Sequence, residues 1–282
     1  MLRRCILTTV FLFLVCVPSW AADVDLLMGN PSKARTDPTQ KHNYLMNKAF
    51  FALSYNDSTG TPNWVSWHLT KDHFGDAPRK RKFDADTTLP GDFTRITHDD
   101  YTNSGFDRGH MCPRSDRDNN KEMSFATFVM TNIVPQSNEN NAGAWNQLEL
   151  YARFLVTDKG KELYIIAGPQ GMRGEGRNGF KNKIAGGKVT VPNKVWKVIM
   201  VLDANNDDRD IERVDENTRL IAVIMPNDRS VPQNNWWQYR VSVKEVEELT
   251  GHTFFDNVPA NIITPLKEDV DEEFIPVLAR EH

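Results

Sequence analysis

Runs of β-branched and aromatic residues recur along the chain and predict the strands of a sheet. Turn signals such as Gly168-Pro169 and Pro226-Asn227-Asp228 follow several of these runs, so we expect those strands to end in loops. The predicted strands cover residues 50–55, 64–69, 162–167, 189–191, 197–202 and 220–225.

Two segments show helical periodicity. Residues 141–155 carry apolar side chains at positions 145, 148, 152 and 155, which is the spacing of one helix face. Residues 242–249 begin with Ser242, have Glu245 three residues later and are followed by Gly251, which is the pattern of a capping box with a glycine stop. Together these elements predict an α+β fold, with a central antiparallel or mixed β-sheet flanked by helices.

The composition is that of an ordinary globular protein. The 282 residues are 39% hydrophobic and 26% charged, and no repeat or Pro/Ser-rich linker divides the chain. We therefore expect a polar leader segment over residues 22–42, one domain over residues 43–264 and a solvated acidic tail over residues 265–282.

The first 21 residues are typical of a secretory signal peptide. Arg3 and Arg4 precede an apolar stretch over residues 5–18, and the small residues Ser19 and Ala21 predict cleavage after Ala21. An uncleaved membrane anchor is the alternative, but the apolar stretch is shorter than the ~20 residues of a spanning helix. The predicted location is therefore secreted or periplasmic.

Cleavage of this peptide would change the charge and the cysteine content. It removes two arginines and no acidic residue, so the formal net charge of −4 becomes −6. A polyanion must then be held by a local basic patch and not by the global charge. Cys112 is the one cysteine left after cleavage. We expect it to be buried as a small apolar side chain, the alternative being a reactive nucleophile.

A candidate general base lies in the segment Asp107-Arg108-Gly109-His110. His110 follows a glycine, and Arg108 lies two residues before it. A neutral imidazole can take up a proton near neutral pH, and a guanidinium can contact phosphate. Taken alone, the pattern also fits a structural histidine on the surface.

Asn141 opens the predicted helix over residues 141–155 and is a candidate metal ligand. A helix N-terminus favours anions, and an amide oxygen there can coordinate Mg²⁺, which needs few protein ligands. The alternative is that Asn141 only caps the helix.

Glu149 and Arg153 lie further along the same predicted helix, four residues apart. They can form a solvated ion pair of little consequence. On a regular helix, however, Glu149 lies about 80° around the axis from Asn141 and roughly 12 Å along it. The carboxylate could therefore share a site with a metal ion while the arginine reaches a phosphate.

The densest basic run in the chain is Arg79-Lys80-Arg81-Lys82. The planar fork of an arginine suits a phosphodiester, and Arg79 is the candidate contact, with Arg81 as its competitor. A solvated loop is the alternative interpretation of such a run.

These motifs resemble the DNA/RNA non-specific endonucleases of the ββα-metal (His-Me finger) group, above all the secreted NucA-type enzymes and more distantly mitochondrial endonuclease G. The resemblance extends from about Asn43 to Ile263. It is carried by Asp107-Arg108-Gly109-His110, by Asn132-x-x-Pro135-Gln136, and by Asn141-x-x-x-Trp145-x-x-Leu148-Glu149-x-x-x-Arg153. The resemblance implies a ββα-metal motif within the predicted α+β fold.

The resemblance also implies a role for each candidate residue. His110 would be the general base, Asn141 the Mg²⁺ ligand and Glu149 the group that holds water on the metal. Asn132 would orient the site. The residues implied to contact or neutralise phosphate are Arg79, Arg108 and Arg153. The implied cofactor is Mg²⁺, with Mn²⁺ as a substitute, and the implied substrates are DNA and RNA, bound through the phosphate backbone and cut to 5′-phosphate ends.

Two other functional classes compete with this interpretation. The first is a secreted nucleic-acid-binding protein that keeps the scaffold without catalysis. The second is a zinc phosphoesterase or metalloprotease, which would need several His, Cys or Asp ligands at close spacing. The sequence contains no H-E-x-x-H motif.

Overall fold

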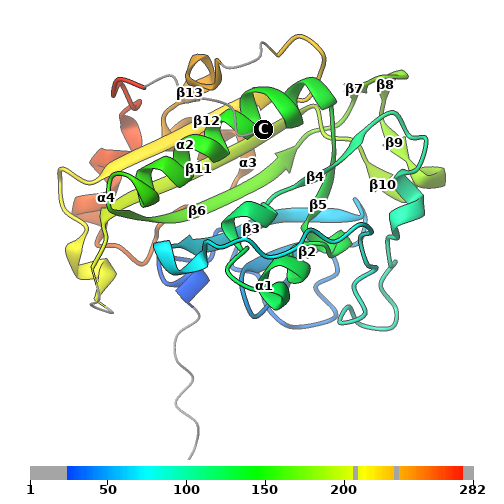
Figure 1. The fold of residues 1–282 in the computed structure, drawn as a ribbon, viewed down its shortest axis with the longest axis horizontal. Helices are drawn as coiled ribbons and strands as arrows, with labels where there is room; N and C mark the ends of the chain where they lie inside the picture. Colours follow the sequence, from blue (N-terminus) through cyan, green and yellow to red (C-terminus); the bar gives the residue numbers. More distant parts are fainter. Residues whose placement is uncertain (1–23, 206–208, 232–234, 276–282) are drawn as a thin grey trace, which may run out of the picture.

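A seven-stranded antiparallel sheet lies at the centre of the structure, a computed structural model that describes residues 24–205, 209–231 and 235–275 (Figure 1). In spatial order its strands are β1 (Tyr44–Asn47), β2 (Ala52–Asn56), β3 (Thr61–Leu69), β6 (Lys161–Gln170), β11 (Lys194–Asp203), β12 (Arg219–Pro226) and β13 (Arg240–Val241). The predicted α+β class is confirmed. The run at 189–191 is the exception among the predicted strands, because it lies in a small sheet outside the central one.

Helices cover both faces of this sheet, which explains why its middle strands are continuous apolar runs. The helix α2 (Trp145–Thr157) packs against one face, where Trp145 and Leu148 join Ile165 and Ile199 in one hydrophobic core. The helices α3 (Val243–Thr250) and α4 (Ala260–Glu268) pack against the other face. Strands β6 and β11 therefore lie between two apolar layers.

The predicted capping box is present at the start of α3. The backbone N–H of Glu245 donates to the Ser242 hydroxyl, and the Ser242 N–H donates to the Glu245 carboxylate. Gly251 ends the helix with a φ of 71°, in the left-handed region that favours glycine.

The shorter elements lie around the central sheet. The two-stranded sheets pair β4 (Asp107–His110) with β5 (Ile133–Gln136), β7 (Gly174–Gly176) with β8 (Gly179–Lys181), and β9 (Lys183–Ile184) with β10 (Val189–Thr190). The remaining helical elements are α1 (Lys121–Ala126), η1 (Val24–Leu26), η2 (Lys71–His73), η3 (His98–Tyr101), η4 (Arg114–Asp116), η5 (Met130–Asn132), η6 (Asn140–Ala144), η7 (Ala185–Gly187), η8 (Asp210–Arg213) and η9 (Trp236–Tyr239).

The acidic tail is only in part the solvated segment that we predicted. Asp271 is buried, and its two carboxylate oxygens accept hydrogen bonds from Arg219 Nε at 2.8 Å and Nη2 at 2.9 Å. The prediction is wrong for this residue because two arginines of the sheet, Arg219 and Arg240, neutralise its charge. Glu272 and Glu273 are exposed as expected.

The predicted leader packs onto the sheet at its first described residues, because the His68 N–H of β3 donates to the carboxylate of Asp25 at 2.8 Å. The predicted signal peptide and residues 276–282 lie outside the described part of the chain. Within that part, no helix combines the length and the apolar character that crossing a membrane requires.

Candidate active site

The Asp-Arg-Gly-His segment forms strand β4, which is held tightly against β5. Gly109 lies opposite Val134, and a Cβ atom at Gly109 would come within 2.0 Å of Gln136 Oε1. No other residue fits there without moving the Gln136 side chain. This close approach of the two strands fixes the backbone positions from which the side chains of Arg108 and His110 project.

The imidazole of His110 lies in an aromatic environment. Its ring centroid is 5.2 Å from that of Phe83 and 5.1 Å from that of Phe128. Burial, together with the positive charge of Arg79, lowers the pKa of His110 from 6.5 to about 3. The ring is therefore neutral at physiological pH. Its Nε2 atom is buried and has no hydrogen-bond partner among the residues that the structure describes.

Asn132 holds the backbone directly after His110. Its Oδ1 accepts from the Cys112 N–H at 3.0 Å, and its Nδ2 donates to the Cys112 carbonyl at 2.9 Å. Its own carbonyl accepts from the N–H of Met111 at 3.0 Å. This placement fits the orienting role expected of Asn132. Cys112 is fully buried, and burial raises the pKa of its thiol, so the expectation of a buried apolar cysteine is confirmed.

The segment around Asn141 differs from the helix that we predicted. The α-helix α2 begins at Trp145, and residues 140–144 form the π-type turn η6, in which Gly143 has non-helical φ and ψ angles of −100° and −116°. Asn141 therefore does not open the helix, and its side chain caps neither element. The capping alternative is wrong, and so is the regular-helix geometry assumed between Asn141 and Glu149.

The side chain of Asn141 points instead toward β4. Its Nδ2 donates to Asp107 Oδ2 at 3.1 Å, and the same oxygen accepts from Asn138 Nδ2 at 2.9 Å. Asp107 thus connects the strand that carries His110 to the turn before α2.

Three of the sequence-predicted residues line one cleft of 740 Å³: Arg79, Arg108 and Asn141. Arg108 is held in place because its guanidinium donates to the His98 carbonyl and to the Thr102 hydroxyl. Phe83 also lines the cleft and contacts the ring of His110. The cleft therefore combines cationic side chains and an amide. His110 is not among the residues that line it, and its ring is linked to the cleft through the contact with Phe83.

Glu149 does not line this cleft. Its side chain is 11% exposed, and its Oε1 lies 3.7 Å from Nζ of Lys197, which is 2% exposed on β11. Burial raises the pKa of Glu149 and lowers that of Lys197, while the two charges oppose these shifts by stabilising each other. The carboxylate therefore has a buried cation as its partner.

Arg153 is also outside the cleft that holds Asn141. Its Nη1 lies 3.3 Å from Asp116 Oδ1, and its side chain lines a separate hollow with Arg114 and Asp118. The solvated Glu149–Arg153 pair of the sequence interpretation is thus replaced by two ion pairs with residues from other elements.

The donors around Asn141 fit a hard divalent cation. The amide NH₂ of Asn141 donates to the carboxylate of Asp107, which leaves the amide oxygen as its ligating atom beside a negative charge. Mg²⁺ prefers oxygen ligands and keeps most of its waters, so it needs few such groups. Asn141 would hold the ion, and Asp107 would orient the Asn141 side chain through their hydrogen bond.

Sequence reasoning missed two residues of this cleft, Asp107 and Arg177. Asp107 belongs to the Asp107-Arg108-Gly109-His110 segment. Its signal was its place three residues before the candidate base. Arg177 lies far along the chain, and nothing in the local sequence links it to β4.

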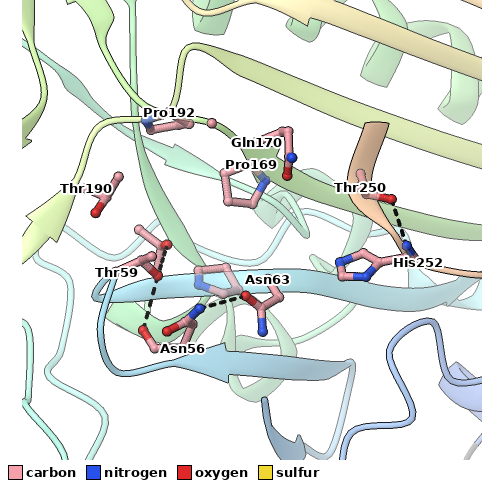
Figure 2. A pocket seen from close by; sticks show the side chains of 12 residues that line it. Asn56, Thr59, Asn63, Pro169, Gln170, Thr190, Pro192, Thr250 and His252 are labelled. Carbon is pink, nitrogen blue, oxygen red and sulfur yellow. Dashed lines mark hydrogen bonds between the residues drawn. The ribbon is translucent and has the colours of Figure 1, made fainter. Parts of the chain in front are cut away.

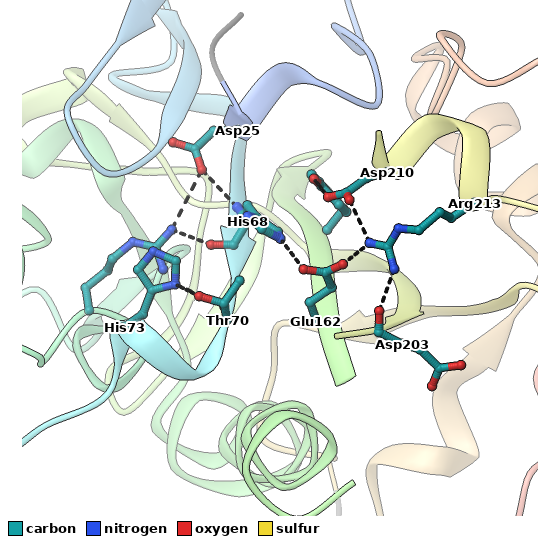
Figure 3. Close-up of polar contacts among 10 residues, drawn as sticks. Asp25, His68, Thr70, His73, Glu162, Asp203, Asp210 and Arg213 are labelled. Atoms are coloured by element: carbon teal, nitrogen blue, oxygen red, sulfur yellow. Dashed lines mark hydrogen bonds and ion pairs between the residues drawn. The ribbon is translucent and has the colours of Figure 1, made fainter. Parts of the chain in front are cut away.

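A second group of potential metal ligands, at the ends of the interior strands β3 and β6, bears on the zinc alternative. Atoms of His68, Glu162 and Asp210 lie within 4.8 Å of one another (Figure 3). The guanidinium of Arg213 bridges the two carboxylates, and the Tyr164 hydroxyl donates to Asp210. Arg213, Tyr164 and His68 already engage the two carboxylates, so the structure explains this group as a network of ion pairs and hydrogen bonds and not as a zinc centre.

A smaller pocket of 230 Å³ lies at the ends of β2, β3 and β6 (Figure 2). Neutral amides and hydroxyls such as those of Asn56, Asn63 and Thr250 line it, together with His252. Burial lowers the pKa of His252 to about 4, so this side chain is uncharged as well. The described residues that line the pocket offer no cation for a polyanion.

Comparisons with known proteins identify the family. Residues 28–261 match the DNA/RNA non-specific endonuclease family. The chain is 47% identical to a nuclease of Nostoc sp. over 88% of this chain and 86% of that protein, and 31% identical to Nuclease C1 of Cunninghamella echinulata over 86% and 91%. Its fold is similar to that in the crystal structure of an EndoG/EndoGI complex, with a TM-score of 0.68 and 26% identity over 84% of this chain and 92% of the other.

Members of this family typically use a divalent metal ion and act on nucleic acids. The family match covers most of the chain, including β4, β5, the turn η6 and α2. The chain belongs to the DNA/RNA non-specific endonuclease family and is a phosphodiester hydrolase.

Proposed function

We propose that this endonuclease is exported and uses Mg²⁺, with Mn²⁺ as a substitute, to cut DNA and RNA to 5′-phosphate ends. The observation that carries the proposal is the convergence of Arg79, Arg108 and Asn141 on one cleft, whose wall residue Phe83 contacts the neutral ring of His110. A cation ligand, phosphate contacts and a proton acceptor are the three groups that phosphodiester hydrolysis needs.

His110 is the general base of the proposed mechanism. Its imidazole is neutral, so one ring nitrogen carries a lone pair that can accept a proton from an attacking water. The anionic phosphate of the substrate would stabilise the protonated ring and raise its low pKa toward the working range. A histidine base requires no 2′-hydroxyl, which is why both DNA and RNA are expected substrates.

Asn141 is the proposed cation ligand, with Asp107 beside it. When bound there, Mg²⁺ would stabilise charge on the phosphate oxygens and supply an acidic water for the departing 3′ oxygen. Because the amide of Asn141 is neutral, the phosphate itself contributes negative charge around the ion.

The arginines Arg79 and Arg108 neutralise phosphate oxygens in this proposal, and both line the cleft. For Arg153 the same role stays a prediction, since its present partner is Asp116. The role of Glu149 in holding water on the ion also stays a prediction, since its present partner is Lys197.

Contacts to phosphate carry no base information, so we expect weak sequence preference and activity that falls as salt rises. Export to the periplasm or the medium is proposed from the N-terminal pattern of the sequence alone.

Digestion of supercoiled DNA and of RNA, with Mg²⁺ or with chelator, tests the proposal. Wild-type protein should nick and degrade both substrates only with the metal, and His110→Ala should lose about 10²–10⁴-fold in rate while unfolding at the wild-type temperature. A folded His110→Ala variant that cuts at the wild-type rate would refute the mechanism. Degradation by wild-type protein in the presence of chelator would refute the proposed dependence on the metal ion.

A further inference from the structure

The β7–β8 hairpin is docked directly on the loop that leads into strand β4. The Arg177 N–H donates to the Gly105 carbonyl at 2.9 Å, and Lys181 Nζ donates to the Ser104 carbonyl at 3.0 Å. A Cβ atom at Gly176 would come within 2.4 Å of the Gly105 carbonyl oxygen, so the two backbones are in contact. The position of the hairpin is therefore fixed relative to β4.

The tip of this hairpin reaches into the cleft. Gly176 pairs with Gly179, so Arg177 and Asn178 form the connecting turn, and both line the cleft together with Asn141. The Arg177 side chain is 66% exposed, and its Nη2 lies 3.7 Å from Asp107 Oδ1. An exposed guanidinium thus stands beside the carboxylate that binds Asn141.

The hairpin and the segment after it form a local basic region in an acidic chain. Residues 173–188 contain one acidic residue, Glu175, and a set of five basic residues: Arg173, Arg177, Lys181, Lys183 and Lys188. Of these, Arg177 is the one that lines the cleft. The guanidinium of Arg173 lies instead over the exposed ring of Phe180, 5.0 Å from its centroid.

We propose that Arg177 is a substrate-binding residue that contacts a backbone phosphate next to the scissile one. This inference rests on the proposed function, which locates the scissile phosphate in the cleft. Arg177 contacts a different phosphate of the same backbone. The long, exposed ion pair with Asp107 is weak enough to be exchanged for a phosphate. Arg79 and Arg177 then hold the nucleic acid backbone from two segments of the cleft wall.

The test is nucleic acid binding without hydrolysis. The affinity of Arg177→Ala for a short DNA duplex is measured in chelator over a series of salt concentrations. We expect a 3–10-fold weaker Kd and a salt dependence whose slope in log Kd against log salt is smaller by about 0.9, the value for one lost phosphate contact. With metal, KM should rise by a similar factor and kcat should stay within twofold.

Arg173→Ala is the matched control, since it removes the same charge from the same hairpin outside the cleft. It should leave the Kd and KM within twofold of wild type. Equal losses in both variants would show that the hairpin acts only through its overall charge, and an unchanged Kd in Arg177→Ala would show that Arg177 does not touch the substrate. Either outcome overturns the inference.

The result is independent of the catalytic proposal. If His110→Ala keeps full activity but Arg177→Ala binds DNA more weakly than Arg173→Ala, the proposed base is wrong and the phosphate contact stands. Thermal unfolding of both hairpin variants, and Arg177→Lys as a variant that keeps the charge, establish that a loss of binding does not come from a displaced hairpin.

Discussion

Two polar residues of neighbouring elements, Asn141 in the turn η6 and Glu149 in the helix α2, lie in opposite environments. Asn141, in the turn before the helix, faces a cleft and binds Asp107. Glu149, inside the helix, is buried against Lys197, whose ammonium also lies 4.1 Å from the ring centroid of Trp145. The first group can meet an exogenous cation and the second already has a protein cation. The chemical type of a residue therefore does not establish its role. For Asn141 and for Glu149, the effect of a substitution on activity and its effect on stability are measured separately.

The largest expected effect is the loss of activity on substitution of Asn141. Asn141→Ala removes the proposed cation ligand, and we expect kcat/KM with Mg²⁺ to fall by about 100-fold or more. The variant leaves the core intact, so its unfolding free energy should stay within about 0.5 kcal/mol of wild type. Initial rates on DNA and urea unfolding measure the two quantities.

Asn138→Ala is a suitable control, because Asn138 also donates to Asp107 but does not line the cleft. It should cost less than tenfold in activity. A wild-type rate in Asn141→Ala would remove this residue from the mechanism.

The next largest effect is the loss of stability on substitution of Glu149. Glu149→Gln leaves the ammonium of Lys197 without its anionic partner, and breaking a buried pair on one side costs about 3–5 kcal/mol. The double variant Glu149→Gln/Lys197→Met removes both charges and should recover most of that loss, as measured by urea unfolding.

The activity of the stable double variant decides the role of Glu149. If hydrolysis returns with stability, the carboxylate acts only as the partner of Lys197. If the double variant is stable but its kcat remains at least tenfold low at saturating Mg²⁺, the predicted role in holding water on the ion is supported.

The sheet was predictable from the sequence because its strands bury continuous apolar runs, as β6 and β11 do between two layers of helices. Strand β4 was not predictable as a strand. Its residues Asp107, Arg108 and Gly109 have low β-propensity, and it forms because Gly109 allows close contact with Gln136 of β5. The resemblance to the family, and not periodicity, pointed to this segment.

The cleft was predictable in part. The motif spacing pointed to Arg108 and Asn141, which share the cleft, because β4, β5 and the turn η6 are close in sequence. The partners of the two helix residues were not predictable, since Glu149 meets Lys197 on β11 and Arg153 meets Asp116 on η4. These pairs join residues far apart in the sequence, and apolar periodicity carries no information about them. The π-type turn at 140–144 was also not predictable, because it depends on the φ and ψ angles of Gly143.

The smallest effect expected is a dependence of stability on pH that comes from His110, which lies on strand β4 beside the cleft residue Phe83. The unfolded chain protonates His110 near the ordinary pKa of 6.5, whereas the folded protein protonates it near a pKa of about 3. Between these values the unfolded state binds more protons, so stability falls as the pH falls through this window. Relative to pH 7, His110 should lower the unfolding free energy at pH 5 by about 2 kcal/mol.

Substitution of a non-titrating residue isolates this contribution. His110→Gln should lose less stability than wild type between pH 7 and pH 5, as measured by urea unfolding at each pH. His252→Gln, in the neutral pocket of Figure 2, is the matched variant, because burial lowers the pKa of His252 to about 4. Both substitutions should reduce the acid sensitivity, but only His110→Gln should abolish hydrolysis. If wild type and His110→Gln lose stability equally between these pH values, then burial does not hold His110 neutral in the folded protein, and its readiness to accept a proton must have another cause.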